Sequence, residues 1–274
     1  MSYKDQIDVA EQLLRNVSIP TLPKAILELQ NLFEEYEIPP TNKIKNALVV
    51  NPFLAGELVG LANIPALTNS SHIKISDIDT AIHRLGTKYL KNYVMAITIK
   101  ELLNKSKING LSYHSQVIAK ITMEIARYNK YIRPDEAYLL GLIHDIGTFA
   151  LAEIDENYGS TFVNRLTNHF SIEKDEEARF GTTHSAIGYA LAHSWNVPSY
   201  ISQTLLLHHS SNINLIKNDK LKSLVALIEL AHSLSIKHNQ GKQENDLNHH
   251  IYQTSKTILN LSDDDIINIR NHIK

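Results

Sequence analysis

Apolar residues recur at helical spacing along this chain from end to end, and that recurrence limits its fold more than any other feature. Leu54, Leu58 and Leu61, for example, form a stripe that would face one side of a helix. We find no convincing stretch with the alternating apolar and polar pattern of a half-buried strand. The chain is therefore predicted to be all-α.

Prolines, glycines and short polar side chains divide this pattern into separate helices. The step Asn51-Pro52 would begin one of them, and Gly86 would close another. The segment 104–110 is the best candidate for a junction, so we expect one subdomain at 1–108 and a second at 109–274. The expected helices lie near residues 25–33, 43–50, 52–62, 78–85, 88–103, 112–130, 134–146, 160–170, 183–194, 198–209, 221–238, 246–260 and 263–273.

Composition excludes several classes of protein. The chain has 274 residues, a formal net charge of −2 and no cysteine, which excludes a disulfide framework, a thiolate metal site and a thiol nucleophile. The near-neutral charge gives no reason to expect binding to nucleic acid or to an anionic membrane. The start of the chain is too polar for a signal peptide, and we see no apolar run long enough to span a bilayer. A cytoplasmic location is the simplest expectation.

An adjacent His144-Asp145 pair is the most informative local feature. It follows an apolar run that reads as helix from about residue 136, and Gly147 suits a left-handed position just after the helix end. The pair would then lie at the negative end of the helix dipole, where a cation is favoured. Imidazole nitrogens and carboxylate oxygens are both good ligands for first-row metals.

Further histidines occupy apolar helix faces or helix ends elsewhere. His114 and His232 share faces with aliphatic stripes, His184 begins a helix, and the pair His208-His209 ends one. Taken singly, each is more simply a buried histidine that hydrogen-bonds to backbone carbonyls. Together they could satisfy several buried imidazoles by binding a metal ion. The other histidines offer no companion ligands or lie in polar surroundings: His72, His83, His169, His193, His238, His249, His250 and His272.

The order of these landmarks resembles the HDOD family, a non-GYP branch of the HD metal-dependent phosphohydrolase superfamily. The resemblance covers about residues 17–235. Its landmarks in this sequence are Ile19-Pro20, Leu22-Pro23, Asn51-Pro52, Leu61-Ala62-Asn63, Leu85-Gly86, His114, Leu142 to Gly147, Glu177 to His184, Gly188, Trp195, Pro198 and His208-His209.

The resemblance implies an N-terminal helical bundle (1–108) packed on an HD-like helical core with C-terminal helices (109–274). It also implies a role in bacterial signal transduction, usually without demonstrated catalysis. Related phosphodiesterases would use the equivalents of six residues as ligands for one or two metal ions: His114, His144, Asp145, His184, His208 and His209.

Three departures from the hydrolase pattern weaken an enzymatic interpretation. The late Ala-Asp step is Ala231-His232 here, and a neutral imidazole cannot bridge two ions as a carboxylate does. The lysine that often follows His-Asp-x-Gly is Thr148, and Ser210 begins a segment that lacks the Gly-Tyr-Pro element. We therefore expect at most a single divalent ion (Fe, Zn, Mn or Ni), with His232 as a further candidate ligand. No catalytic residue is assigned, except Asp145 if the protein is a hydrolase.

Three functions follow from different interpretations of this site. The preferred one is a non-catalytic regulatory protein that binds, in trans, a partner protein or a small signalling ligand. The alternative is a metal-dependent phosphohydrolase acting on a nucleotide or cyclic dinucleotide, for which Arg127, Arg133 and Arg179 are the arginines expected near the site. The third is a structural helical adaptor whose histidines are ordinary buried polar groups.

Overall fold

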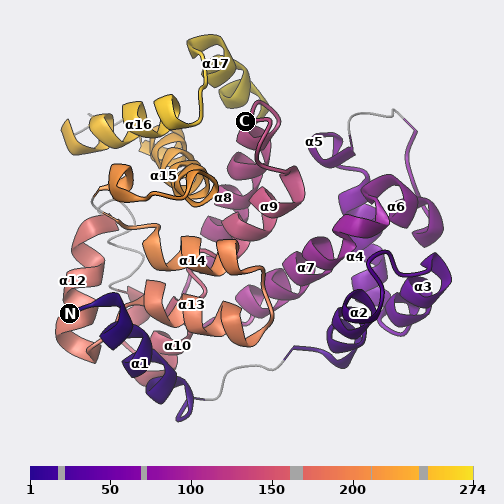
Figure 1. The fold of residues 1–274 in the computed structure, drawn as a ribbon, viewed down its shortest axis with the longest axis horizontal. Coiled ribbons are helices and arrows are strands. Elements are labelled where there is room, and N and C mark those ends of the chain that lie inside the picture. The colour runs from indigo at the N-terminus through magenta and orange to yellow at the C-terminus, as the bar shows by residue number, and fades with distance from the viewer. Residues whose placement is uncertain (18–21, 69–72, 161–168, 211, 241–245, 274) are drawn as a thin grey trace.

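A computed structural model describes residues 1–17, 22–68, 73–160, 169–210, 212–240 and 246–273. Within these ranges the regular structure consists of α-helices and short 3-10 helices, with no strand (Figure 1). The all-α prediction is confirmed.

Short helices dominate the first part of the chain. Asn51 caps the helix that begins at Pro52 by accepting a hydrogen bond from the Leu54 amide, and Asp77 caps the helix that begins at Ile78 in the same way. The elements are α1 (Tyr3–Leu14), α2 (Lys24–Glu35), α3 (Thr41–Val49), α4 (Pro52–Ala62), α5 (Pro65–Thr68), α6 (Ile78–Leu85), the 3-10 helix η1 (Thr87–Tyr89) and α7 (Leu90–Asn104).

The second part contains the helices that carry the candidate ligands. Its elements are α8 (Leu111–Ala126), α9 (Pro134–Ile143), α10 (Gly147–Ile154), α12 (His169–Phe180), α13 (His184–Ser194), α14 (Ser199–Leu207), the 3-10 helix η2 (Ile213–Leu215), α15 (Asp219–Gln240), α16 (Asp246–Ile258) and α17 (Asp263–His272).

The described helices depart from the expected ones in two places, and a third expected helix falls mostly outside the described residues. The polar segment at the start of the chain, for which no helix was expected, forms α1, which begins with a capping box of Ser2 and Asp5. The helix expected at 134–146 ends at Ile143, and Gly147 is not a left-handed terminator but the first residue of α10. Of the helix expected at 160–170, residues 161–168 lie outside the described ranges, and α12 begins at 169.

Helix α7 joins the group formed by α2 to α6 to the rest of the molecule (Figure 1). It packs against α2 and α4 on one side and against α9 on the other. In the larger group, α8 packs on α9, α10 and α14 pack on α13, and α15 packs on α8, α14 and α16. Helix α1 packs against α13, although it is the first element of the chain. The division at 108/109 remains a prediction.

The segment Pro134–Ile154 is apolar and long enough to cross a membrane, contrary to the expectation that no such run exists. It comprises α9, the turn that follows it and α10, and 89% of its most apolar window is buried inside the protein. The central helices of folded cores have the same length and composition, so its burial assigns this segment to the core of the fold.

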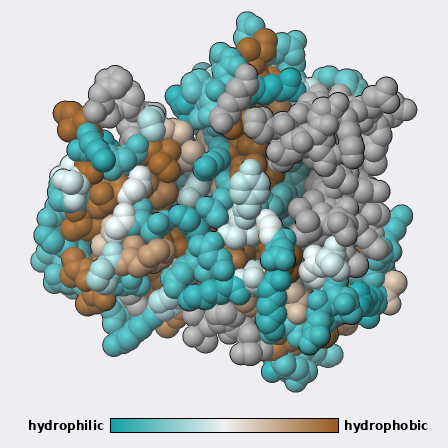
Figure 2. Space-filling model, turned by 180° about the vertical axis from the view of Figure 1, so that it is seen from behind, coloured by the Kyte–Doolittle hydropathy of each residue, from teal (hydrophilic) through white to brown (hydrophobic). Residues whose placement is uncertain are grey.

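Apolar surface is exposed over the group formed by α2 to α6. Seen from behind, hydrophobic residues gather over this part of the molecule, at the left in Figure 2. The exposed large apolar side chains of α2 to α4 and their connections are Leu27, Ile38, Val49, Val50 and Phe53.

Candidate metal centre

Five separate segments deliver the seven candidate ligands to one buried place. His114 and His232 lie within α8 and α15, and His184 is the first residue of α13. The pairs His144-Asp145 and His208-His209 directly follow α9 and α14. Six of the seven residues are at most 8% exposed, and the side chain of His114 is 12% exposed. The fold therefore brings together every candidate ligand that the sequence indicates.

One oxygen of the Asp145 carboxylate faces a first group of imidazoles. Its Oδ1 atom lies 3.5 Å from His184 Nε2 and 3.5 Å from His208 Nε2. The Nε2 atom of His209 lies 3.1 Å from that of His184. The four residues offer ligand atoms that lie within 4.8 Å of one another, a spacing that could hold a metal ion.

The other oxygen of Asp145 faces a second group. Its Oδ2 atom lies 3.0 Å from His144 Nε2 and 3.4 Å from His114 Nε2. The Nε2 atom of His232 lies 3.0 Å from that of His144. These three histidines also offer ligand atoms within 4.8 Å of one another. The carboxylate of Asp145 thus lies between two sets of histidines.

Hydrogen bonds on the far side of the rings fix how two of these imidazoles point. The Nδ1 atoms of His144 and His208 lie 2.8 and 2.6 Å from the carbonyl oxygens of Gly141 and Leu205. Because a carbonyl can only accept, each Nδ1 donates, and in the neutral ring Nε2 keeps its lone pair. These lone pairs face the Asp145 oxygens, an arrangement that a cation between them would stabilise.

Glu176 orients the ring of His184, and no motif in the sequence points to it. Its Oε2 atom lies 2.7 Å from His184 Nδ1 and also accepts a hydrogen bond from the His184 amide, while Tyr158 donates its hydroxyl to Oε1. Glu176 falls at helical spacing between Ile172 and Phe180. A carboxylate on the apolar face of a helix is the signal that could have found it.

Burial and charge shift the pKa values of the site in opposite directions. Burial alone would raise the pKa of Asp145, but the surrounding histidines, His144 above all, hold it well below its usual value. Burial lowers the pKa of His144, although Asp145 opposes that effect. Burial also disfavours the charged form of His184, but the Glu176 carboxylate outweighs burial and raises the pKa of His184 to about 9.

The donor set fits a divalent metal ion. Among the described side chains, His114 Nε2, His208 Nε2 and Asp145 Oδ1 are buried without a hydrogen-bond partner. Metal–ligand bonds of about 2.0–2.2 Å would place neighbouring ligand atoms roughly 3.0–3.5 Å apart. The distances between the ligand atoms given above, from 3.0 to 3.5 Å, match that spacing.

The arginines expected near a phosphate have carboxylate partners outside the cluster. Arg127 pairs with Glu124 at 2.7 Å, and Arg179 pairs with Asp155. Arg133 is 2.8 Å from Asp135 and 3.3 Å from Glu136. These contacts do not support the expectation that the three arginines serve the site.

Thr148 and the five remaining histidines that the structure describes lie outside the cluster of candidate ligands. The Thr148 hydroxyl is buried and donates to the Asp145 carbonyl at 2.7 Å, so it steadies the turn between α9 and α10. The side chains of His72, His169 and His238 lie outside the described residues. The remaining five histidines without an expected ligand role are exposed: His83, His193, His249, His250 and His272.

Comparison with known sequences gives one family. A family profile of the HDOD domain matches residues 19–211. An uncharacterized protein of Treponema pallidum (strain Nichols) is 22% identical over a match of 215 residues, and the match covers 70% of this chain and 38% of that protein. The chain therefore spans well under half the length of this curated relative.

Solved structures share the fold over nearly the whole chain. An HDOD domain protein of unknown function from Geobacter sulfurreducens superposes with a TM-score of 0.70 at 23% identity, covering 99% of this chain and 98% of the other. A candidate metal-dependent phosphohydrolase from Shewanella amazonensis SB2B gives 0.69 at 16% identity, with 100% of both chains covered. The MmoQ response regulator of Methylococcus capsulatus str. Bath gives 0.51 at 19% identity, covering 92% and 98%.

Proposed function

Because the chain belongs to the HDOD domain family, we propose that it is a regulatory protein of bacterial signal transduction that binds a partner protein or a small signalling ligand. It holds one divalent metal ion and does not catalyse a reaction. The observation that carries this proposal is the convergence of six histidines on the buried carboxylate of Asp145, in a site whose expected phosphate-binding arginines have other partners.

The metal would be held on the Oδ1 side of Asp145, with His184, His208 and His209 as its imidazole ligands. Mixed imidazole and carboxylate donors suit Fe, Zn, Mn or Ni. A divalent ion bound there would supply a Lewis acid. Glu176 and the Leu205 carbonyl hold the rings of His184 and His208 in place from behind, which supports a site formed before the ion arrives.

A non-catalytic role is supported by what surrounds the centre. His232 replaces the late carboxylate of the hydrolases and lies against His144, and Thr148 uses its hydroxyl within the backbone turn. A transferring phosphoryl group needs positive charge at its oxygens. The arginines that could provide that charge form ion pairs elsewhere.

Binding of a partner protein is supported by the exposed apolar surface over α2 to α6 (Figure 2). Val49, Val50 and Phe53 lie at the junction of α3 and α4 and expose between 47% and 69% of their surface. Contiguous exposed apolar residues commonly mark interaction sites. A cytoplasmic location accompanies this proposal.

Metal analysis of protein purified without a histidine tag tests the centre directly. We expect close to one ion per chain in the parent protein, and loss of that ion in Asp145→Ala. His83→Ala, which removes an exposed histidine of α6, is the matched control and should retain it. Absence of Fe, Zn, Mn and Ni above the buffer level in the parent protein would contradict the proposed centre and favour the structural adaptor.

The hydrolase remains the second candidate because each oxygen of Asp145 faces its own set of histidines. Purified, metal-loaded protein should show no turnover against a panel of nucleotides and cyclic dinucleotides. Turnover that disappears in both His144→Ala and Asp145→Ala would overturn the non-catalytic assignment. Two ions per chain would also shift the balance towards the hydrolase.

A further inference from the structure

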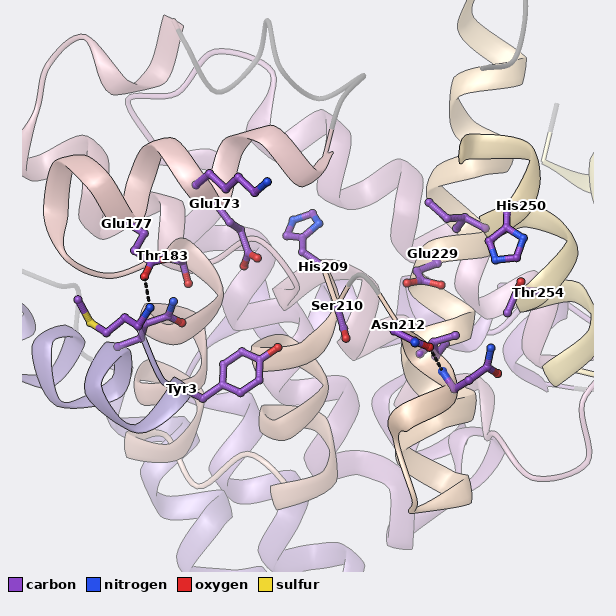
Figure 3. A pocket seen from close by; sticks show the side chains of 16 residues that line it. Tyr3, Glu173, Glu177, Thr183, His209, Ser210, Asn212, Glu229, His250 and Thr254 are labelled. Atoms are coloured by element: carbon purple, nitrogen blue, oxygen red, sulfur yellow. Dashed lines mark hydrogen bonds and ion pairs between the residues drawn. The ribbon is translucent and has the colours of Figure 1, made fainter. Parts of the chain in front are cut away.

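A pocket of about 540 Å³ opens beside the histidine cluster, where His209 forms part of its lining. Its walls come from α1, α12, α15, α16 and the segment that follows α14. Figure 3 shows the side chains that project into it, among them Tyr3, Glu173, Asn212 and Glu229. The pocket is large enough for a small organic ligand.

Much of this pocket is built by parts of the chain outside the matched residues 19–211. Tyr3 comes from α1, Glu229 from α15 and Thr254 from α16. The flanking helices therefore supply the groups that would select a ligand, while the matched domain supplies His209 and Glu173.

Carboxylates outnumber cations in the lining of the pocket. Figure 3 shows Glu173 and Glu229 on either side of His209, projecting from α12 and α15. Among the described residues, Glu173 has no hydrogen-bond or ion-pair partner, and Glu177 is paired with the Met1 ammonium at 2.6 Å. Lys174, the lysine of the lining, is exposed. Three carboxylates against two cations give the lining a small net negative charge, which Glu173 and Glu229 carry outside the Met1 ion pair.

Glu229 is an unusual residue for a pocket wall because it is only 8% exposed. Its Oε2 atom accepts a hydrogen bond from the Ser255 hydroxyl at 3.0 Å, and its other oxygen has no partner among the described residues. Burial raises the pKa of this carboxyl to about 7. A buried carboxylate without a positive partner is costly, and a cation in the pocket would supply that partner.

We propose that this pocket binds a small organic cation, an amine or a guanidinium compound, between the carboxylates of Glu173 and Glu229. The proposal deepens the function given above, because it assigns a chemical class to the small signalling ligand. Charge-assisted hydrogen bonds from N–H groups to the two carboxylates hold the ligand. The same carboxylates would repel the phosphates of nucleotides and cyclic dinucleotides, so we expect those compounds not to bind in this pocket.

Calorimetric titration of the full-length, metal-loaded protein at physiological ionic strength tests this assignment. The probes are putrescine, spermidine and agmatine as cations, and GMP as the phosphate-bearing comparison. We expect at least one of the cations to bind saturably at one site per chain, and GMP not to bind. Binding of GMP together with no saturable binding of any of the three cations would overturn the proposal, as would the absence of binding by all probes.

Variants separate the pocket from general attraction of cations to an acidic protein. Glu229→Gln and Glu173→Gln should each weaken cation binding at least tenfold. Glu101→Gln, which removes an equivalent charge from α7, should leave binding unchanged. An equal loss in all three variants would refute a specific site. Melting curves recorded for each variant confirm that it is folded.

Metal content measured on the same samples distinguishes the two proposals. Metal bound at Asp145 without any cation binding would reject the pocket and leave the metal-binding function standing. Specific cation binding to protein that holds no metal would support the pocket and reject the metal centre.

Discussion

At the scale of single residues, Glu176 fixes how His184 is presented to the cluster. It is 3% exposed and bonds both the ring and the backbone amide of His184. Carboxylates that hold a metal-ligating histidine from behind set its tautomer and raise its basicity. Glu176 is therefore a positioning residue for the candidate centre.

Replacing Glu176 with Gln should weaken metal binding by roughly 10–100-fold, because the charge that holds His184 is lost. Tyr158→Phe removes only the donor to the other oxygen of Glu176 and should have a smaller effect. Competition with a chelator of known affinity measures both. The neighbouring Glu177→Gln is the control, and an equal loss of affinity there would argue against a specific role for Glu176.

Glu229 should make the metal-free protein less stable as the pH rises. Its pKa is about 7 in the folded state and near 4.5 when unfolded, so the folded state binds the proton more tightly between these values. The contribution of protonated Glu229 to the free energy of unfolding is fully present below about pH 4.5 and is lost as the pH rises through about 7. The loss amounts to about 3 kcal/mol at most.

The Glu229→Gln variant tests this pH dependence. Free energies of unfolding measured by urea titration at pH 5 and pH 8 should differ less in the variant than in the parent protein. Glu101→Gln should follow the parent. If the free energy of unfolding changed equally with pH in Glu229→Gln and in the parent, the pKa of Glu229 would not be raised in the folded protein.

At the scale of elements, glycine allows the helices that carry ligands to approach closely. A Cβ atom on Gly147 would lie 1.9 Å from the His184 carbonyl oxygen and 2.7 Å from the Gly188 nitrogen. A Cβ atom on Gly141 would lie 2.4 Å from the Ala119 Cα atom. These contacts bring α10 onto α13 and α9 onto α8, and they fix the distance from Asp145 to His184 and His114.

Gly147→Ala should destabilise the protein by at least about 2 kcal/mol, because backbone atoms of α13 have to move away. The same movement displaces His184, so metal affinity should fall as well. Gly56→Ala in α4 is the matched control: it meets no atom within 4 Å and should stabilise by about 0.5–1 kcal/mol. Thermal unfolding of both variants tests the contrast, and a neutral Gly147→Ala would contradict the close packing.

The helical pattern in the sequence predicted α4 at its observed bounds and α7 to within two residues at either end. It failed at Gly147, because a glycine that permits close packing looks the same in sequence as one that ends a helix. It missed α1, whose buried face consists of Gln6 and Ala10 and carries little apolar signal. The candidate ligands were identifiable because histidine is rare on apolar faces, whereas the supporting Glu176 depends on contacts between distant segments.

At the scale of the whole molecule, an ion-pair network joins α7 to the core. Arg133 donates to both oxygens of Asp135, at 2.9 and 2.8 Å, and Asn92 of α7 donates to the same carboxylate at 2.7 Å. Tyr200 of α14 and Lys220 of α15 both donate to Glu136, at 2.6 and 3.1 Å. Four helices thus meet at two buried carboxylates.

Arg133→Met should cost about 2 kcal/mol or more, because it leaves Asp135 and Glu136 buried with fewer positive partners. The effect stays below that of a fully buried pair because the arginine side chain is 40% exposed. Lys105→Met breaks an exposed pair with Glu101 and should cost less than about 0.5 kcal/mol. Urea unfolding distinguishes the two, and equal losses would mean that the network does not stabilise the junction.

Helix α1 also affects the order in which the chain folds. The carbonyl of Gln6 accepts its hydrogen bond from the Thr182 hydroxyl, 176 positions further along. During synthesis, α1 can therefore dock only after α13 has left the ribosome, whereas α2, α3 and α4 find their neighbours at once. The side of the pocket formed by Tyr3 closes late, so a nascent chain acquires its ligand specificity among the last steps of its folding.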